Sequence, residues 1–277
     1  MNAELTGHQH LAGQPGTLAL LVAGIALTGG VAQLLAAARL RRRGDRWPYA
    51  RDVCCAAGAA ALTAGALATP PGGPFTAHMT QHLVTGMAAP LLLALGRPVT
   101  LVLRSLPPPS HRRLLAVLRS RPAAVLAHPV TAALLDVGGL WLLYRTPLFA
   151  AAHERPWLSA LVHVHVFTAG LLLSVALCAL DPPARRHGTA LKAAVLVGAG
   201  GAHSVLAKTL YAAPPPGTRF APGDLAAGAE VMYYGGDLVE IALAVAVALH
   251  WYTAGGRRLA RERRRAAAPP ASAPYGQ

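Results

Sequence analysis

The fold is decided by residues 78–95, HMTQHLVTGMAAPLLLAL. Its two histidines, His78 and His82, are four residues apart and fall on one face of a helix, one turn from each other. The apolar run that follows, Leu83–Leu95, indicates a membrane-spanning helix. Because histidine inside a bilayer is costly, it usually faces protein, water, a metal or a cofactor. This stretch predicts ligand chemistry at one mouth of a membrane bundle.

The composition indicates an integral membrane protein. Of 277 residues, 54% are apolar and 13% are charged, whereas soluble domains carry about 25% charged residues. The net charge of +14 would suggest nucleic acid in a soluble protein. Here the basic residues cluster between apolar runs, so membrane topology explains them and no nucleic-acid binding is expected. The cysteines, Cys54, Cys55 and Cys178, show no CxxC or zinc spacing.

Seven apolar runs are long enough to span the bilayer. They are separated by Pro- and Gly-rich joins, and residues 97–121 between two of them have the pattern of amphipathic helices at the membrane surface. The predicted spans are about Thr17–Ala38, Ala50–Thr69, Phe75–Leu95, Val125–Tyr144, Trp157–Leu180, Leu191–Tyr211 and Leu225–Tyr252.

The basic residues predict the orientation of these spans. Alternate joins and the C-terminal tail hold 21 of the 25 Lys and Arg residues, and such regions face the cytoplasm. We therefore expect an all-α, multi-pass membrane protein with seven transmembrane helices, the N-terminus outside and the C-terminus cytoplasmic. Residues 1–16 form the outside segment, 17–253 the seven-helix membrane domain, and 254–277 a basic cytoplasmic tail that is disordered beyond about residue 266.

Ionisable side chains from five spans share one layer of the predicted bundle. At roughly 1.5 Å per residue, these residues fall in the outer half of the membrane or near its midplane: His78, His82, His163, His165, His203, Asp136, Glu230, Asp237 and Glu240. A site between helices and open to the outside is expected. Each histidine also has a structural interpretation, as a helix-end or packing residue, and only the shared depth favours a site.

His163 and His165 point about 200° apart on a helix, so both cannot easily face one small site. His163 shares a small and polar stripe with Ser159, Gly170 and Ser174, which favours a position facing the bundle. His165 is then free to bond a neighbouring helix or a carboxylate.

Histidine and methionine in this layer favour copper or haem. Imidazole binds copper, zinc and iron, and a thioether adds softness for Cu(I), which makes Met79 and Met232 candidate ligands. Asp136 and Asp237 are expected to orient the histidines. Magnesium and calcium prefer oxygen ligands. The chain has no nucleotide-binding loop, G-x-S-x-G elbow or HExxH motif, so a non-enzymatic role is expected.

Four blocks resemble the CtaG family of cytochrome c oxidase assembly factors. They are residues 78–107, 163–182 (HVHVFTAGLLL with the following DP), 198–211 (GAGGAHSVLAKTLY) and 223–244. The resemblance implies a protein of the bacterial cytoplasmic membrane that helps to mature a haem–copper oxidase, with a role in copper supply. Carried over by position, His78, His82, His203 and Asp237 match best, then His163 or His165. In the last block Leu225 follows Asp224, where the family pattern has glutamine.

We therefore predict an assembly factor that binds or delivers copper at an outward-facing, His-rich site, with an oxidase subunit as its client. Two alternatives use the same residues. A proton-coupled or metal transporter would use the intramembrane His and Asp residues as a relay, and many such folds contain an inverted repeat, which this sequence lacks. A haem-binding membrane protein is the other alternative.

Overall fold

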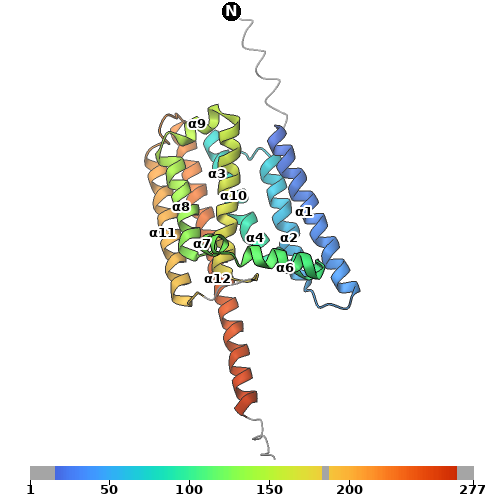
Figure 1. Ribbon diagram of the computed structural model, residues 1–277. Coiled ribbons are helices and arrows are strands. Elements are labelled where there is room, and N and C mark those ends of the chain that lie inside the picture. The colour runs from blue at the N-terminus through green and yellow to red at the C-terminus, as the bar shows by residue number, and fades with distance from the viewer. Residues whose placement is uncertain (1–15, 183–186, 267–277) are drawn as a thin grey trace, which may run out of the picture.

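The computed structural model describes residues 16–182 and 187–266, and every regular element in these ranges is a helix. Figure 1 shows an upright bundle from which the last helix emerges at the lower end. In chain order the elements are α1 (Thr17–Arg42), α2 (Tyr49–Leu67), α3 (Pro74–His82), the π-helix η1 (Leu83–Ala88), α4 (Ala89–Gly96), α5 (Pro98–Ser105), α6 (Pro108–Leu118), α7 (Arg121–Leu126), α8 (Pro129–Arg145), α9 (Leu148–Glu154), α10 (Pro156–Cys178), α11 (Thr189–Ala212) and α12 (Pro222–Ala266).

Six helical runs in the described part of the chain are long and apolar enough to cross a membrane. They are α1, α2, the run α3–α5, α10, α11 and α12 up to Gly256. This confirms the all-α membrane architecture. The remaining predicted span, residues 125–144, is not among these six. Its first two residues belong to α7, and most of the others form α8. With 17 residues, α8 falls below the roughly 20 that a hydrocarbon core requires, although it packs beside α10 and α11.

The predicted third span contains a π-helical segment directly after His82. Pro90 has no amide hydrogen to donate to the carbonyl of Gly86, four residues earlier, so the α-helical ladder is interrupted there. The Gly86 carbonyl lies against Gly170 of α10, where a β-carbon would overlap it. The wider turn of the π-helix and the lack of a side chain at Gly170 therefore let α10 lie close to the helix that carries His78 and His82.

Two aspartates from distant parts of the chain cap the helices of this region. The carboxylate of Asp224 accepts hydrogen bonds from the backbone N–H of Phe75 (2.9 Å) and Thr76 (3.0 Å) at the start of α3. Asp181 does the same for Val99 and Thr100 at the start of α5. Each acidic group satisfies N–H donors that the first turn leaves unpaired. Asp224 thereby fixes the N-terminus of α3 against α12.

The lower end of the bundle carries the arginine-rich joins. Asp52 of α2 pairs with Arg41 of α1 and accepts a hydrogen bond from Trp47 Nε1. Figure 1 shows α6 and α7 lying across the lower part of the bundle, in the segment where amphipathic surface helices are expected. The helix α12 continues to Ala266, beyond residue 253, where the predicted membrane domain ends. The rest of the predicted tail, residues 267–277, and nearly all of the predicted outside segment lie outside the described residues.

Candidate metal centre

A small cavity lies beside the His78–His82 pair, between α3, α8 and α10. The cavity volume is about 30 Å³. This is enough for two or three waters, or for an ion with a water. It is lined by His78, Gln81, His82, Thr85, Leu143, Tyr144, Val162, His163 and Val166. We call it the histidine cavity. Its size fits an ion, whereas drug-sized ligands occupy roughly 300–1,000 Å³.

His78 is held by Tyr144 of α8. Its Nε2 lies 2.9 Å from the buried Tyr144 hydroxyl, so Nδ1 is the nitrogen that remains for another ligand. The rings of Phe149 and His153, both on α9, lie 4.9 and 6.2 Å from the His78 ring, centroid to centroid. These contacts hold the His78 ring in place beside the cavity.

His82 is buried, with 6% of its surface exposed, and its Nε2 has no hydrogen-bond partner among the described residues. The ring of His203, on α11, lies 6.3 Å away, centroid to centroid. His203 is 2% exposed, and neither of its ring nitrogens has a hydrogen bond within the described part of the chain. Buried polar groups normally have partners, so the Nε2 atoms of His82 and His203 are the strongest local sign of a ligand site.

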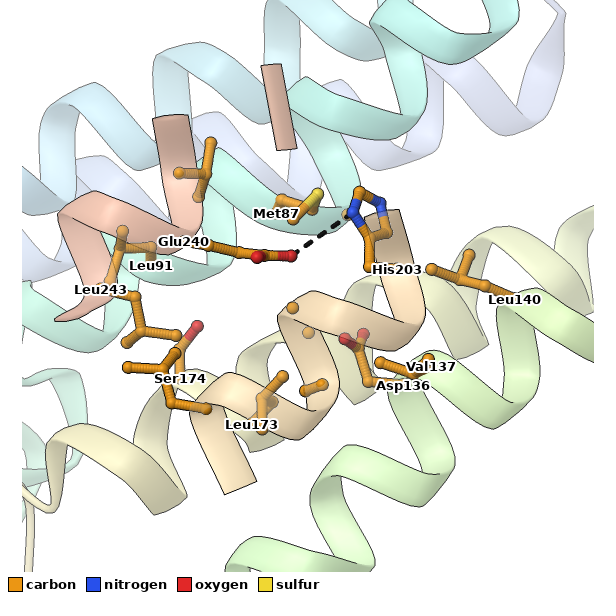
Figure 2. Close-up of a pocket in the computed structure, with 16 residues that line it drawn as sticks. Met87, Leu91, Asp136, Val137, Leu140, Leu173, Ser174, His203, Glu240 and Leu243 are labelled. Atoms are coloured by element: carbon orange, nitrogen blue, oxygen red, sulfur yellow. Dashed lines mark ion pairs between the residues drawn. The ribbon is translucent and has the colours of Figure 1, made fainter. Parts of the chain in front are cut away.

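Glycines on two facing helices make room for His203 and for Glu240. A β-carbon at Gly236 of α12 would lie 2.8 Å from His203 Nδ1, and closer to Cε1. A β-carbon at Gly200 of α11 would overlap the Glu240 carboxylate of α12. The two side chains are thus set into reciprocal notches, and His203 Nδ1 lies 3.3 Å from Glu240 Oε1. Figure 2 shows the carboxylate and the imidazole pointing toward one another.

The two histidines of α10 have different surroundings. His163 is exposed and donates from Nδ1 to the Ser159 carbonyl (2.7 Å), which leaves Nε2 as an acceptor or ligand. It lines the histidine cavity and also a larger, mainly apolar groove of about 680 Å³ beside α1 and α2. His165 instead contacts α8, where its Nε2 donates to the Leu135 carbonyl (3.0 Å) opposite Gly139. The structure therefore brings His163, and not His165, to the cavity.

The other predicted site residues, His203 included, are not among the residues that line the histidine cavity. Met79 and Met232 are 0% and 1% exposed and belong to an apolar cluster with Phe75 and Leu206; neither lines the histidine cavity. Asp237 accepts a hydrogen bond from Ser204 (3.1 Å). Glu230 is exposed on α12.

Asp136 and Glu240 line a second cavity with His203, and Met87 is part of the same lining. Sequence reasoning did not select Tyr144, His153, Met87 or the glycine notches. The spacings Gly200-x-x-His203 and Gly236-x-x-x-Glu240 are the signals that would have indicated the notches.

A copper ion fits part of this arrangement. Bonds from a metal to imidazole nitrogen are about 2.0–2.1 Å long, so two rings that share one ion have centroids roughly 5–6.5 Å apart. The His82–His203 separation falls within that range. Within residues 16–182 and 187–266, no three His, Cys, Asp or Glu side chains are grouped closely enough to hold a metal ion. The protein therefore offers two buried histidines, His82 and His203, whose rings lie 6.3 Å apart, with His78 and His163 nearby.

Comparisons with known proteins identify a family and several relatives. A family model described as cytochrome c oxidase caa3 assembly factor (Caa3_CtaG) matches residues 31–254. Uncharacterized proteins of Mycobacterium bovis and Mycobacterium tuberculosis are each 39% identical over 174 residues, which cover 59% of this chain and 26% of the relative.

A Mycobacterium leprae protein, also uncharacterized, is 32% identical over 176 residues, or 60% of this chain and 27% of the relative. The chain thus spans about a quarter of the length of the curated relatives it matches. No solved structure matches it. Since the family model covers most of the sequence, the chain belongs to the Caa3_CtaG family of cytochrome c oxidase assembly factors.

Proposed function

We propose that this protein assists the assembly of a cytochrome c oxidase by holding a copper ion in the histidine cavity and passing it to an oxidase subunit. The observation that carries the proposal is a pair of buried nitrogens without hydrogen bonds among the described residues. They are Nε2 of His82, which lines the cavity, and Nε2 of His203, whose ring lies 6.3 Å from the His82 ring, centroid to centroid. Neutral imidazole is a good copper ligand. Burying a ring nitrogen without a hydrogen-bond partner is costly, so we expect a bound ligand to be the partner of these nitrogens.

The small number of protein ligands supports delivery rather than permanent storage. With two converging histidines, a bound ion retains open coordination positions, as catalytic metal sites do and closed structural sites do not. His163 lies at the boundary between the cavity and the larger groove, with Nε2 free. A client's ligands would take the ion from this side by occupying the open positions.

We further propose a seven-span topology in the bacterial cytoplasmic membrane, with the N-terminus outside and the C-terminus cytoplasmic. In Figure 1, α1 begins at the end of the bundle opposite the one from which α12 emerges, and this arrangement supports an odd number of crossings. α8 is the helix available for the seventh crossing. The arginine-rich joins lie at the end from which α12 emerges, as cytoplasmic segments do. The histidine cavity then opens toward the outside.

The size and surroundings of the cavity favour copper holding over the two alternatives. A porphyrin does not fit a cavity of about 30 Å³. Metal transport through the bundle requires a polar path to the cytoplasmic end. Toward that end, beyond the lining of the cavity that holds Asp136 and Glu240, α10 instead contributes Ala176, Leu177 and Cys178 to an apolar cluster.

The function is tested in a bacterial strain in which this gene is deleted and restored on a plasmid. We expect oxidase purified from cells with the wild-type gene to contain its full copper, and oxidase from the His78→Ala/His82→Ala strain to lack copper while retaining haem. The matched control is His111→Ala on α6, away from the cavity. Full copper in the oxidase from the double variant would contradict the proposal.

A further inference from the structure

A large apolar groove runs along the bundle, with α1 and α2 on one side and α10 on the other. Its volume of about 680 Å³ is in the range of drug-sized ligands. Along α1 the lining extends from Leu18 to Gln33, roughly 22 Å at 1.5 Å per residue, which is most of the depth of a hydrocarbon core. We call it the lateral groove. Its apolar lining suits a hydrocarbon chain better than water.

Two arginines lie where the lateral groove reaches the arginine-rich end of the bundle. Arg51 is one helical turn before Cys55 of α2, which lines the groove. Arg97 directly precedes Pro98, another lining residue. A β-carbon at Gly96 would lie 3.3 Å from the Arg51 carbonyl oxygen, so the segments that carry the two arginines are in contact. The apolar groove therefore ends beside two basic side chains.

Neither of these two arginines forms an ion pair within residues 16–182 and 187–266. The nearby carboxylates have other partners. Asp52 pairs with Arg41, and Asp45 pairs with Arg104. Asp181 accepts hydrogen bonds from the first amides of α5. Two guanidinium groups thus remain for an anion that the protein does not itself supply.

Each of the two arginines has a feature that suits binding. The Arg51 guanidinium lies over the Trp47 ring, 4.5 Å from its centroid, and stacking through its face leaves the N–H groups at its edge available. Arg97 has a left-handed backbone with φ of 54°, a conformation that is costly outside glycine and is found at functional positions. The like charges of Arg97 and Arg104 also act on Arg51, and an anion beside them would relieve this repulsion.

We infer that the lateral groove binds an anionic phospholipid, with an acyl chain along the groove and the phosphate at Arg51 and Arg97. The apolar walls bind the hydrocarbon chain, and the two guanidinium groups donate charge-assisted hydrogen bonds to the phosphate. A zwitterionic lipid carries an ammonium group that these arginines repel. The inference goes beyond the proposed function and does not depend on copper binding.

The groove also reaches the histidine cavity. Gln81, Thr85 and His163 line both spaces. An acyl chain in the groove would therefore separate the histidine cavity from the rest of the membrane on this side. If the cavity holds copper as proposed, a client must displace the chain from His163 before it can take the ion.

The test measures lipid binding to the full chain purified in detergent. Phosphatidylglycerol or phosphatidylcholine with identical acyl chains is titrated into the sample, and the lipids bound per chain are counted by native mass spectrometry. We expect the wild type to retain one phosphatidylglycerol and no phosphatidylcholine. Arg51→Gln/Arg97→Gln should bind phosphatidylglycerol roughly 30-fold more weakly, about fivefold for each arginine.

The matched control is Arg112→Gln/Arg113→Gln, which removes two exposed arginines of α6 that do not line the groove. It should bind phosphatidylglycerol as the wild type does. Equal affinities of the two double variants, or equal retention of both lipids by the wild type, would overturn the inference. Inorganic phosphate, which has no acyl chain, should not displace the bound lipid. Displacement by phosphate would overturn the assignment to a lipid.

A second pair of variants tests the groove itself and leaves the arginines in place. Gly29 lines the groove and Gly24 does not, and a β-carbon at either position of α1 meets nothing within 4 Å. We expect Gly29→Leu to fill part of the groove and lose the phosphatidylglycerol, and Gly24→Leu to keep it. Equal retention by the two folded variants would overturn the inference.

Discussion

The Gly236→Ala substitution tests whether the position of His203 matters for copper binding. The new β-carbon would lie 2.8 Å from His203 Nδ1, and closer to Cε1, whereas ordinary contacts begin at 3.4 Å. The ring must therefore move by at least about 0.6 Å. Metal–ligand distances tolerate only about ±0.2 Å, so the displacement is about three times what the bonds accept.

We expect copper affinity to fall by roughly 10- to 100-fold, the range for losing a group that positions a metal ligand. This corresponds to about 1.4–2.7 kcal/mol of binding free energy. The assay is competition for copper with a chromophoric chelator, using the purified chain in detergent. Thermal unfolding of the same samples shows whether the variant is folded.

Gly201→Ala is the matched control, because it lies two residues from His203 and its methyl group meets nothing within 4 Å. It should bind copper as the wild type does, and it should gain up to about 1 kcal/mol of stability, since alanine is the better helix former. Equal copper affinities for Gly236→Ala and Gly201→Ala, with both variants folded, would refute the role of His203.

Three further substitutions test the supports of the site. Asp224→Ala removes the acceptor for the first amides of α3 and should lower the free energy of unfolding by about 2 kcal/mol, as measured by thermal unfolding, whereas Glu230→Ala, an exposed position on the same helix, should be neutral. Gly170→Ala forces α10 away from the π-helix and should cost about 1–3 kcal/mol in the same assay. Tyr144→Phe removes the hydroxyl that holds His78 and should weaken copper binding by about tenfold in the chelator assay; unchanged affinity would show that this bond does not position the ring.

The sequence predicted the depth of the site residues in the membrane better than the direction in which their side chains point. A rise of 1.5 Å per residue places His82 and His203 at one level, and the structure brings their rings within 6.3 Å. Rotation about a helix axis is harder to predict. Met79 follows His78 but points about 100° away, which directs it into the apolar cluster.

Helix packing decides which acidic side chain lies beside His203, and hydropathy does not reveal that packing. Asp237 and Glu240 are both at a suitable depth, but only Glu240 faces Gly200, where the missing side chain admits its carboxylate. Asp237 pairs with Ser204 instead. The π-helical segment also depends on tertiary contact, because the Gly86 carbonyl, to which Pro90 cannot donate a hydrogen bond, lies against Gly170. Such details follow from the fit between helices rather than from the pattern along one helix.

The most direct test of the central claim is the copper content of the purified full chain, compared between wild type and His78→Ala/His82→Ala, with His111→Ala as the control. We predict that the double variant binds one copper ion per chain fewer than the wild type, and that the control binds as many as the wild type. Equal copper in wild type and double variant, or none in either, would contradict the claim that the histidine cavity holds copper.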